Sequence, residues 1–339
     1  MLNFSFVSLF IFILFFGTFF SLSSTHWFAV WFGLELNLMG FIPIMVQKST
    51  MEETESGVKY FLIQAVGSGL FLFGVLLTSW DFSSWGLGFL GAVGKTGLAF
   101  FALLLKLGGA PFHFWVPSVA AGLSWLSNFL LLTWQKVAPL FMICCYLNLA
   151  NYFLLGLVAM SSFFGGVGGV NQTSLRALIA YSSILHMGWL LAGASISWGV
   201  VFIYFFFYCI ILFFISCLGM KEESLNMSQF SNIFVWKFYS RYCLVLMLLS
   251  LGGMPPFLGF FGKMLILVEL LSLGNIVISI ILILGSMISL YYYLVLSFSL
   301  LLSSSSEYMK SRAEIRNVVG FSMLVGLGGL WSLVWLYSL

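Results

Sequence analysis

Four ionisable side chains lie inside apolar stretches of this sequence. Glu35 stands in WFGLELNLMGFIPI, Lys106 in LLLKLGGAPFHFW, Lys136 in LLLTWQKVAPLFMICC and Lys263 in LSLGGMPPFLGFFGK. A charged residue at the centre of a membrane helix costs roughly 2.5–3.5 kcal/mol on insertion scales, so such residues usually have a function, a partner or a route to the interface. Because a carboxylate and an amine can each bind and release a proton, these four side chains are candidates for proton transfer.

His186, in AYSSILHMGWLLAG, is a fifth candidate. A histidine in mid-span can relay protons at neutral pH, and the alternative is a structural histidine that hydrogen-bonds a neighbouring backbone group. Three further ionisable residues have less central positions. Lys95 lies about three helical turns before Lys106, His113 follows the LGGAP segment, and Glu269 is nearer the end of its apolar run. We assign no role to these three.

The cysteines lie within apolar runs and have no metal-ligand spacing. We therefore expect inert thiols, with no metal, no iron–sulfur cluster and no structural disulfide. The residues concerned are Cys144, Cys145, Cys209, Cys217 and Cys243.

The apolar stretches that hold these candidates are long enough to cross a membrane. Apolar residues make up 62% of the 339 residues and charged residues only 7%, a composition that excludes a soluble protein. About 20 apolar residues span the hydrocarbon core, and on that measure we predict an all-α, polytopic membrane protein. Apolar residues that run continuously, without alternating, disfavour a β-barrel. The eleven predicted spans are 4–22, 26–46, 59–79, 86–117, 124–147, 149–170, 175–195, 198–219, 241–271, 275–302 and 318–338.

The triplet LGG interrupts two of the longest apolar segments, just after Lys106 and shortly before Lys263. Proline removes a backbone donor and glycine lowers the cost of bending, so both segments are predicted to be broken helices. Paired broken helices are typical of transporters with internal repeats. We therefore predict two five-helix inverted repeats, at 1–147 with a break at 107–111 and at 148–302 with a break at 251–256, followed by a loop and a last helix at 303–339. The alternative is that these residues serve helix packing alone.

The basic residues outside the spans all fall on one side of the predicted membrane. They lie at or in the loops after spans 2, 6, 8 and 10, whereas the loops of the opposite face contain no Lys or Arg. This asymmetry predicts that the N-terminus faces the matrix or cytoplasm. Because MLNFSFVSLF lacks a basic region, we interpret it as the first span and not as a removable signal. The nine residues are Lys48, Lys59, Arg176, Lys221, Lys237, Arg241, Lys310, Arg312 and Arg316.

Six segments carry a resemblance to a known family. They resemble, in order and at similar spacing, the subunit 2 family of animal mitochondrial NADH:ubiquinone oxidoreductase (respiratory complex I), one of its antiporter-like membrane subunit families. Most of residues 26–265 take part. The family's usual acidic residues after FHFW are replaced in PSVAAGLSW, its Asn before the histidine is Leu185 here, and GFFGK lacks its usual proline. The segments are WFGLELNLMGFIP, KYFLIQA, KLGGAPFHFWVP, TWQKVAPL, NQTSLRALIAYSSILHMGW and LSLGGMPPFLGFFGK.

The resemblance implies proton pumping by a core subunit of the membrane arm of this NADH:ubiquinone reductase. Glu35 is then the carboxylate of the first half, Lys106 lies on the broken helix, Lys136 is the central lysine and Lys263 is the exit-side lysine. No cofactor is expected in this chain, because FMN, iron–sulfur clusters and ubiquinone belong to partner subunits. The partners are the other membrane-arm and peripheral-arm subunits and the lipid bilayer, with no nucleic acid. The resemblance also implies a location in the mitochondrial inner membrane. Together with the loop charges, it predicts an N-terminus in the matrix and a C-terminus on the intermembrane-space side.

Two other functions are compatible with the same features. A subunit of a multisubunit sodium/proton antiporter shares the broken helices and the buried charges, although the short length and the animal-type motifs disfavour it. A structural subunit of the membrane arm whose charges no longer move protons is the other alternative, and sequence does not separate it from a pumping subunit.

Overall fold

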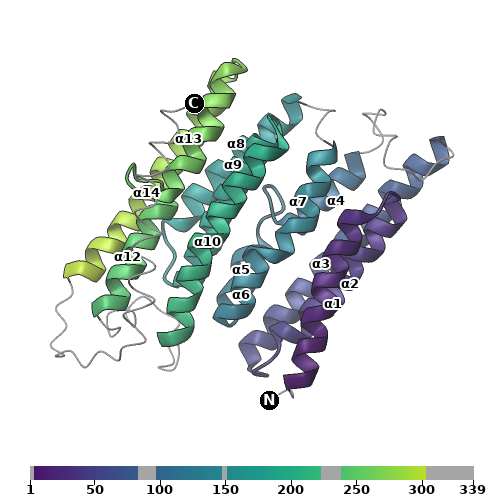
Figure 1. Cartoon of the computed structure of the whole chain (residues 1–339), viewed down its shortest axis with the longest axis horizontal. Coiled ribbons are helices and arrows are strands. Elements are labelled where there is room, and N and C mark those ends of the chain that lie inside the picture. Colours follow the sequence, from purple (N-terminus) through teal and green to yellow (C-terminus); the bar gives the residue numbers. More distant parts are fainter. Residues whose placement is uncertain (1–3, 83–96, 147–150, 223–237, 303–339) are drawn as a thin grey trace. The chain divides into compact units, whose positions relative to one another are not determined.

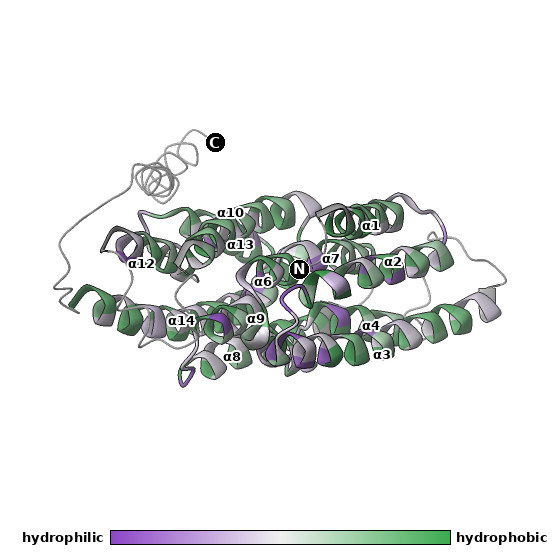
Figure 2. Cartoon of the chain, turned by 90° about the horizontal axis from the view of Figure 1, so that it is seen from below, coloured by the Kyte–Doolittle hydropathy of each residue, from purple (hydrophilic) through white to green (hydrophobic). Residues whose placement is uncertain are grey.

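The computed structural model describes residues 4–82, 97–146, 151–222 and 238–302 (Figure 1). Every regular element within these ranges is an α-helix, which confirms the all-α prediction. The chain separates into two compact units, Met1–Leu157 and Val158–Leu339. Apolar residues dominate the helices of each unit, and hydrophilic residues are few (Figure 2).

The first unit is built on α3, which packs against α2, α4 and α5. α1 packs along α2, and α7 contacts α1, α4 and α6. The first turn of α3 is capped by Thr50, whose hydroxyl oxygen accepts a hydrogen bond from the N–H of Glu53 at 3.3 Å. The helices of this unit are α1 Phe4–Ser23, α2 Trp27–Met45, α3 Met51–Phe82, α4 Gly97–Leu107, α5 Trp115–Gly122, α6 Trp125–Leu132 and α7 Trp134–Tyr146, and α8 Asn151–Gly169 crosses the boundary between the units.

The second unit is built around α9, which is buried along nearly its whole length. α10, α13 and α14 each pack against α9. Small residues permit close packing here, because a Cβ at Gly188 would lie 2.7 Å from the Ser161 hydroxyl of α8. The helices after α8 are α9 Leu175–Ala194, α10 Trp198–Glu222, α12 Phe238–Gly252, α13 Leu258–Ser272 and α14 Ile276–Leu302.

Seven helices in the described part of the chain are long and apolar enough to cross a membrane. They coincide with the predicted spans 4–22, 26–46, 59–79, 124–147, 175–195, 198–219 and 275–302. The predicted span 149–170 corresponds to α8, while 86–117 and 241–271 correspond to interrupted segments. Residues 86–96 and the last predicted span, 318–338, lie outside the described residues.

The first LGG triplet ends α4 in a Schellman-type cap. Gly108 has a φ of +70°, its N–H donates to the carbonyl of Leu105 at 3.1 Å, and the N–H of Gly109 donates to the carbonyl of Leu104 at 3.2 Å. This left-handed conformation favours glycine because it has no Cβ. The chain resumes as a helix only at Trp115, where α5 begins.

The second triplet ends α12 with the same motif, displaced by one residue. Here the left-handed residue is the second glycine, Gly253, with a φ of +83°. Its N–H donates to the carbonyl of Ser250 at 3.1 Å, and the N–H of Met254 donates to the carbonyl of Leu249 at 3.3 Å. Helix α13 then begins at Leu258. Both LGG triplets are therefore helix ends, each followed by a new helix.

The predicted span 124–147 is confirmed as the apolar segment Trp125–Cys145, but one residue interrupts its helix. α6 ends at Leu132 and α7 begins at Trp134, while Thr133 between them has φ −114° and ψ −75°. The Thr133 hydroxyl donates to the carbonyl of Phe129 at 2.6 Å, a side-chain bond that competes with the backbone ladder. Pro139, inside α7, offers no N–H to the carbonyl four residues before it.

We predict that Gly108→Ala destabilises the protein and that Gly69→Ala does not. The left-handed backbone costs a residue with a Cβ about 1–2 kcal/mol, and the added atom would overlap the Val116 side chain and lie 3.2 Å from the Trp115 ring. Gly69, on α3, has nothing within 4 Å of such an atom. The thermal unfolding midpoint of the detergent-solubilised protein should fall for the first variant and stay unchanged or rise slightly for the second. Equal midpoints would contradict this account of the break.

Candidate functional site

Three of the predicted lysines are buried. Lys106, Lys136 and Lys263 are 6%, 4% and 5% exposed, respectively. An ammonium group without water needs hydrogen-bond acceptors or an opposite charge. The surroundings of each lysine therefore indicate how its charge is held.

Lys106 lies in the last turn of α4, directly before the break. Its aliphatic stem lies against α3, because a Cβ at Gly67 would be 3.2 Å from the Lys106 Cγ. The Gln64 side chain, also from α3, donates to the carbonyl of Lys106 at 3.2 Å. On the other side of the break, the Trp115 indole N–H donates to the carbonyl of Leu105 at 3.1 Å. Two side-chain donors thus satisfy carbonyls in the last turn of α4.

Glu35 is half-buried on α2 and lies within electrostatic range of this lysine. The carboxylate of Glu35 attracts the ammonium of Lys106 electrostatically. Opposite charges in a low-dielectric medium attract strongly, so the charge state of one changes the proton affinity of the other. The first unit therefore brings together two of the predicted site residues.

Lys136 is the third residue of α7, between Thr133 and Pro139. Its N–H donates to the carbonyl of Thr133 at 3.1 Å, a short-range bond at the very start of the helix. α7 packs against α4, the helix that carries Lys106. Lys136 thus lies at a helix interruption, as Lys106 does.

Lys263, on α13, binds the end of α12. Its Nζ donates to the carbonyl of Gly252 at 2.7 Å and to the carbonyl of Leu251 at 3.2 Å. These carbonyls belong to the last turn of α12, where the helix dipole is negative. The Nζ also lies 5.9 Å from the centre of the Trp189 ring. The second break thus supplies acceptors for the ammonium group.

His186, on α9, is 5% exposed and has a tyrosine partner. Its Nδ1 lies 2.6 Å from the hydroxyl of Tyr204, which comes from α10. The Tyr204 ring also packs against α13, because a Cβ added at Gly262 would lie only 2.8 Å from the ring. Tyr204 therefore contacts both His186 and the residue next to Lys263. Sequence reasoning missed Tyr204, because nothing in the run FIYFFFYC distinguishes a tyrosine that faces α9 from one that faces lipid.

The remaining ionisable candidates have different environments. His113 is buried between α4 and α5, Glu269 is exposed on α13, and Lys95 lies outside the described residues. All five cysteines are free thiols. Within residues 4–82, 97–146, 151–222 and 238–302, no group of three His, Cys, Asp or Glu side chains is placed to hold a metal ion.

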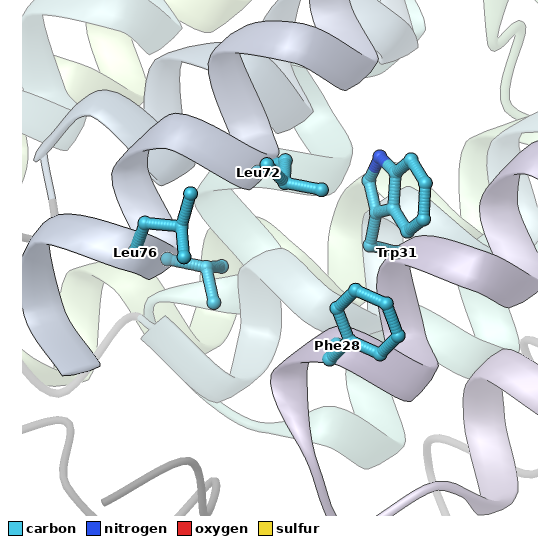
Figure 3. A pocket seen from close by; sticks show the side chains of 5 residues that line it. Phe28, Trp31, Leu72 and Leu76 are labelled. Carbon is cyan, nitrogen blue, oxygen red and sulfur yellow. The ribbon is translucent and has the colours of Figure 1, made fainter. Parts of the chain in front are cut away.

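A small cavity of about 60 Å³ lies between α2 and α3 (Figure 3). It is lined by Phe28, Trp31, Leu72, Val75 and Leu76, and its surface is apolar. None of the candidate charges lines it. Such a cavity suits an apolar group, and it has no chemical part in the site.

Together, fold and site define a helical membrane protein with several spans, whose buried lysines lie beside interrupted helices. The model of the NADH:quinone oxidoreductase/Mrp antiporter transmembrane family matches residues 24–289. The chain belongs to this family.

Individual relatives cover nearly the whole chain. It is 35% identical to NADH-ubiquinone oxidoreductase chain 2 of Anopheles gambiae, over 97% of this chain and 97% of that protein. It is 41% identical to the protein of the same name from Myxine glutinosa, over 88% and 86%. A chain in the structure of respiratory complex I from Thermus thermophilus has the same fold, with a TM-score of 0.81 and 24% identity over 96% of this chain and 78% of that one.

We predict that Tyr204→Phe destabilises the protein by about 0.5–1.5 kcal/mol, because it removes the buried hydrogen bond between the tyrosine hydroxyl and His186. Tyr291→Phe is the matched control, since Tyr291 is 59% exposed on α14 and should change stability by less than about 0.5 kcal/mol. The free energy of unfolding in detergent distinguishes the two variants. If the Tyr204 variant is as stable as the control, the pairing with His186 has no structural importance.

Proposed function

We propose that this chain is a proton-translocating core subunit of the membrane arm of NADH:ubiquinone oxidoreductase. The main support is identity of 35–41%, over most of the chain, with proteins named NADH-ubiquinone oxidoreductase chain 2. The buried charges at helix interruptions add a chemical reason. NADH oxidation and quinone reduction take place in partner subunits, which hold the FMN, the iron–sulfur clusters and the ubiquinone. This chain moves protons.

In this proposal the buried charges have different roles. Lys136 is the switching site, and the Glu35–Lys106 pair sets its proton affinity. Lys263 passes the proton onward at the second break. His186 is a relay, and its contact with Tyr204, which also touches the segment of Lys263, supports that role.

The energy of one interaction between opposite charges is similar to the energy needed to move one proton across the membrane. Moving one proton against about 150 mV requires ~3.5 kcal/mol. Opposite unit charges about 6 Å apart, at an effective dielectric constant near ~20, attract by ~3 kcal/mol. Making and breaking one pair such as Glu35–Lys106 is therefore of the right order for one pumping step.

The proposal includes a topology and a location. Eleven spans form two inverted five-helix repeats, 1–147 and 148–302, and a last helix follows within 303–339. The membrane is the mitochondrial inner membrane, with the N-terminus in the matrix. Two observations support this arrangement, namely the one-sided distribution of the loop Lys and Arg residues and the matching helix caps at Gly108 and Gly253.

A sodium/proton antiporter subunit is the main alternative within the same family. It is not favoured, because the relatives above are named as an NADH-ubiquinone oxidoreductase chain. Copurification with flavin-containing and iron–sulfur subunits distinguishes the two functions.

The role of Lys136 can be tested with two substitutions in the assembled complex. Arginine keeps the charge but releases no proton at an accessible pH, and methionine removes the charge. We expect both Lys136→Arg and Lys136→Met to assemble and to lower proton-coupled quinone reduction by about ten-fold or more, since positioned proton-transfer groups contribute roughly 10²–10⁴-fold.

The control for both variants is Lys59→Met. The Lys59 side chain is 44% exposed and pairs with Glu55 at 2.5 Å, so its loss should leave coupling unchanged. Normal activity in Lys136→Arg together with failure of Lys136→Met would show a structural cation, as in a non-pumping subunit.

The proposed topology predicts the side from which tags are accessible. A tag at the C-terminus should react from the intermembrane space, and a tag within 303–317 should react only from the matrix. The measurement is labelling of intact mitochondria and of inverted inner-membrane vesicles with an impermeant reagent. If both tags react from the same side, the count of eleven spans is wrong.

A further inference from the structure

Two of the segments that resemble the family, KYFLIQA and TWQKVAPL, contain uncharged polar residues. The roles proposed for the four charged residues do not explain why these residues are polar. Tyr60 and Gln64 come from the first segment, and Gln135 comes from the second. All three make hydrogen bonds between helices of the first unit. These bonds link the segments that carry Lys106 and Lys136.

The Gln135 amide is bound at both ends. The Tyr60 hydroxyl of α3 donates to its Oε1 at 3.2 Å, and its Nε2 donates to the Asn37 Oδ1 of α2 at 3.0 Å. Asn37 and Tyr60 are 3% and 2% exposed, so both bonds lie within the protein. The Gln135 side chain thus connects α7 to α3 and α2. Gln135 is next to Lys136 in the sequence, and its partner Asn37 is two residues after Glu35 on α2.

The backbone at this point offers little restraint of its own. Thr133 interrupts the helix just before Gln135, and Pro139 cannot donate to the Gln135 carbonyl, which is four residues before it. A helix start with an incomplete hydrogen-bond ladder has more freedom to tilt or rotate than a continuous helix. The bonds of the Gln135 side chain therefore supply restraint where the backbone lacks it.

The same face of α3 also holds Lys106. Gln64 lies four residues after Tyr60, so the two side chains share one face of the helix. Gln64 donates to the Lys106 carbonyl at 3.2 Å, and Gly67, on the next turn, contacts the Lys106 stem. α3 is thus bonded to α7 through Tyr60 and to α4 through Gln64.

This arrangement restrains position and does not conduct protons. A carboxamide has no titration near neutral pH, so a chain that passes through Gln135 cannot relay a proton. A change of about 1 Å in the position of a reacting group is enough to slow a reaction strongly. A restraint on the start of α7 therefore has a functional value separate from any proton path.

We propose that Gln135 is a positioning residue which, through Tyr60 and Asn37, holds Lys136 at a fixed place relative to the Glu35–Lys106 pair. The inference rests on the proposed function, because it gives a role in proton transfer to Lys136. It adds three uncharged residues to the site and assigns to α3 the task of aligning the two lysine-bearing segments.

The test uses Gln135→Leu, Tyr60→Phe and the double variant in the assembled complex. Gln172→Leu is the matched control, because the Gln172 side chain donates to a carbonyl of its own segment, that of Gly168, at 3.1 Å. We expect Gln135→Leu to lower proton-coupled quinone reduction about five-fold, the effect of losing one or two neutral hydrogen bonds. Tyr60→Phe keeps the ring contacts with Phe41 and Trp115 and should have a smaller effect in the same direction.

Two further readouts separate positioning from general damage. The double variant should be no worse than Gln135→Leu alone, since the Tyr60 hydroxyl acts through the amide. The pH profile of coupled turnover should shift in Gln135→Leu, because Lys136 changes its distance from the titratable groups on the packed helices. α4 carries Lys106, α2 carries Glu35, and α1 and α6 carry none. α3 carries Tyr60 and, toward its two ends, Glu52, Glu53, Glu55, Lys59 and Asp81.

The outcomes distinguish this inference from the proposed function. If Lys136→Met leaves coupling intact, the proposed function fails. If Lys136→Met is impaired while Gln135→Leu matches the wild type in rate and pH profile, only the positioning role is overturned. Additive effects of the two single variants also overturn it. If Gln135→Leu does not assemble, Tyr60→Phe decides, because a shifted pH profile in that variant supports the inference and an unchanged one overturns it.

Discussion

The structure depends on how it satisfies the amine groups of its buried lysines. In a membrane the backbone of an intact helix has no free carbonyl to offer, because each one is already bonded within the helix. Lys106 and Lys136 lie where that ladder is interrupted, and the side chain of Lys263 reaches such a place. Lys263 shows the solution directly, since it donates to two carbonyls in the last turn of α12. The interruptions and the charges are therefore parts of one arrangement.

The two units hold their lysines with different scaffolds. In the first, α3 presents a polar face that reaches α7 through Tyr60 and α4 through Gln64. In the second, the buried helix α9 carries His186 and Trp189, which approach the neighbouring helices through a hydroxyl contact and an aromatic face. Side-chain hydrogen bonds link the helices that carry Lys106 and Lys136, whereas Lys263 has two backbone carbonyls and one aromatic ring beside its ammonium group.

The sequence was sufficient to predict the helical class, the three buried lysines and both LGG breaks, because hydropathy and the chemistry of glycine and proline act locally. It did not predict that Arg176 and Arg241, which were placed outside the spans, are buried as well. It predicted α3 as a span at 59–79, yet the helix begins at Met51. Its first turns are hydrophilic and capped by Thr50, and an apolar window does not detect a helix that extends beyond the membrane. The interruption at Thr133 was also missed, since a single threonine has no strong propensity to end a helix.

The pairings of Tyr204 with His186 and of Gln135 with Asn37 depend on how each helix is rotated against its neighbours. Nearly uniform apolar sequences give little information about rotation, because the side that faces lipid and the side that faces protein are both hydrophobic. Uncharged polar residues in such runs indicate which side of a helix faces other helices, and the segments KYFLIQA and TWQKVAPL contain such residues. Recognising these residues as partners still required the packing of α2, α3 and α7.

The displacement of the left-handed glycine within the LGG triplets has a consequence for comparing the halves of the chain. When the caps are superimposed in register, Gly108 corresponds to Gly253, so Lys106 corresponds to Leu251 and Lys263 corresponds to Ser118. One half thus presents its amine upstream of the break and the other presents it downstream. If the halves descend from a duplicated ancestor, they have ceased to be interchangeable copies. Because the amine lies before the break in one half and after it in the other, the two directions along the chain are not equivalent. Two identical copies related by symmetry would not have this difference.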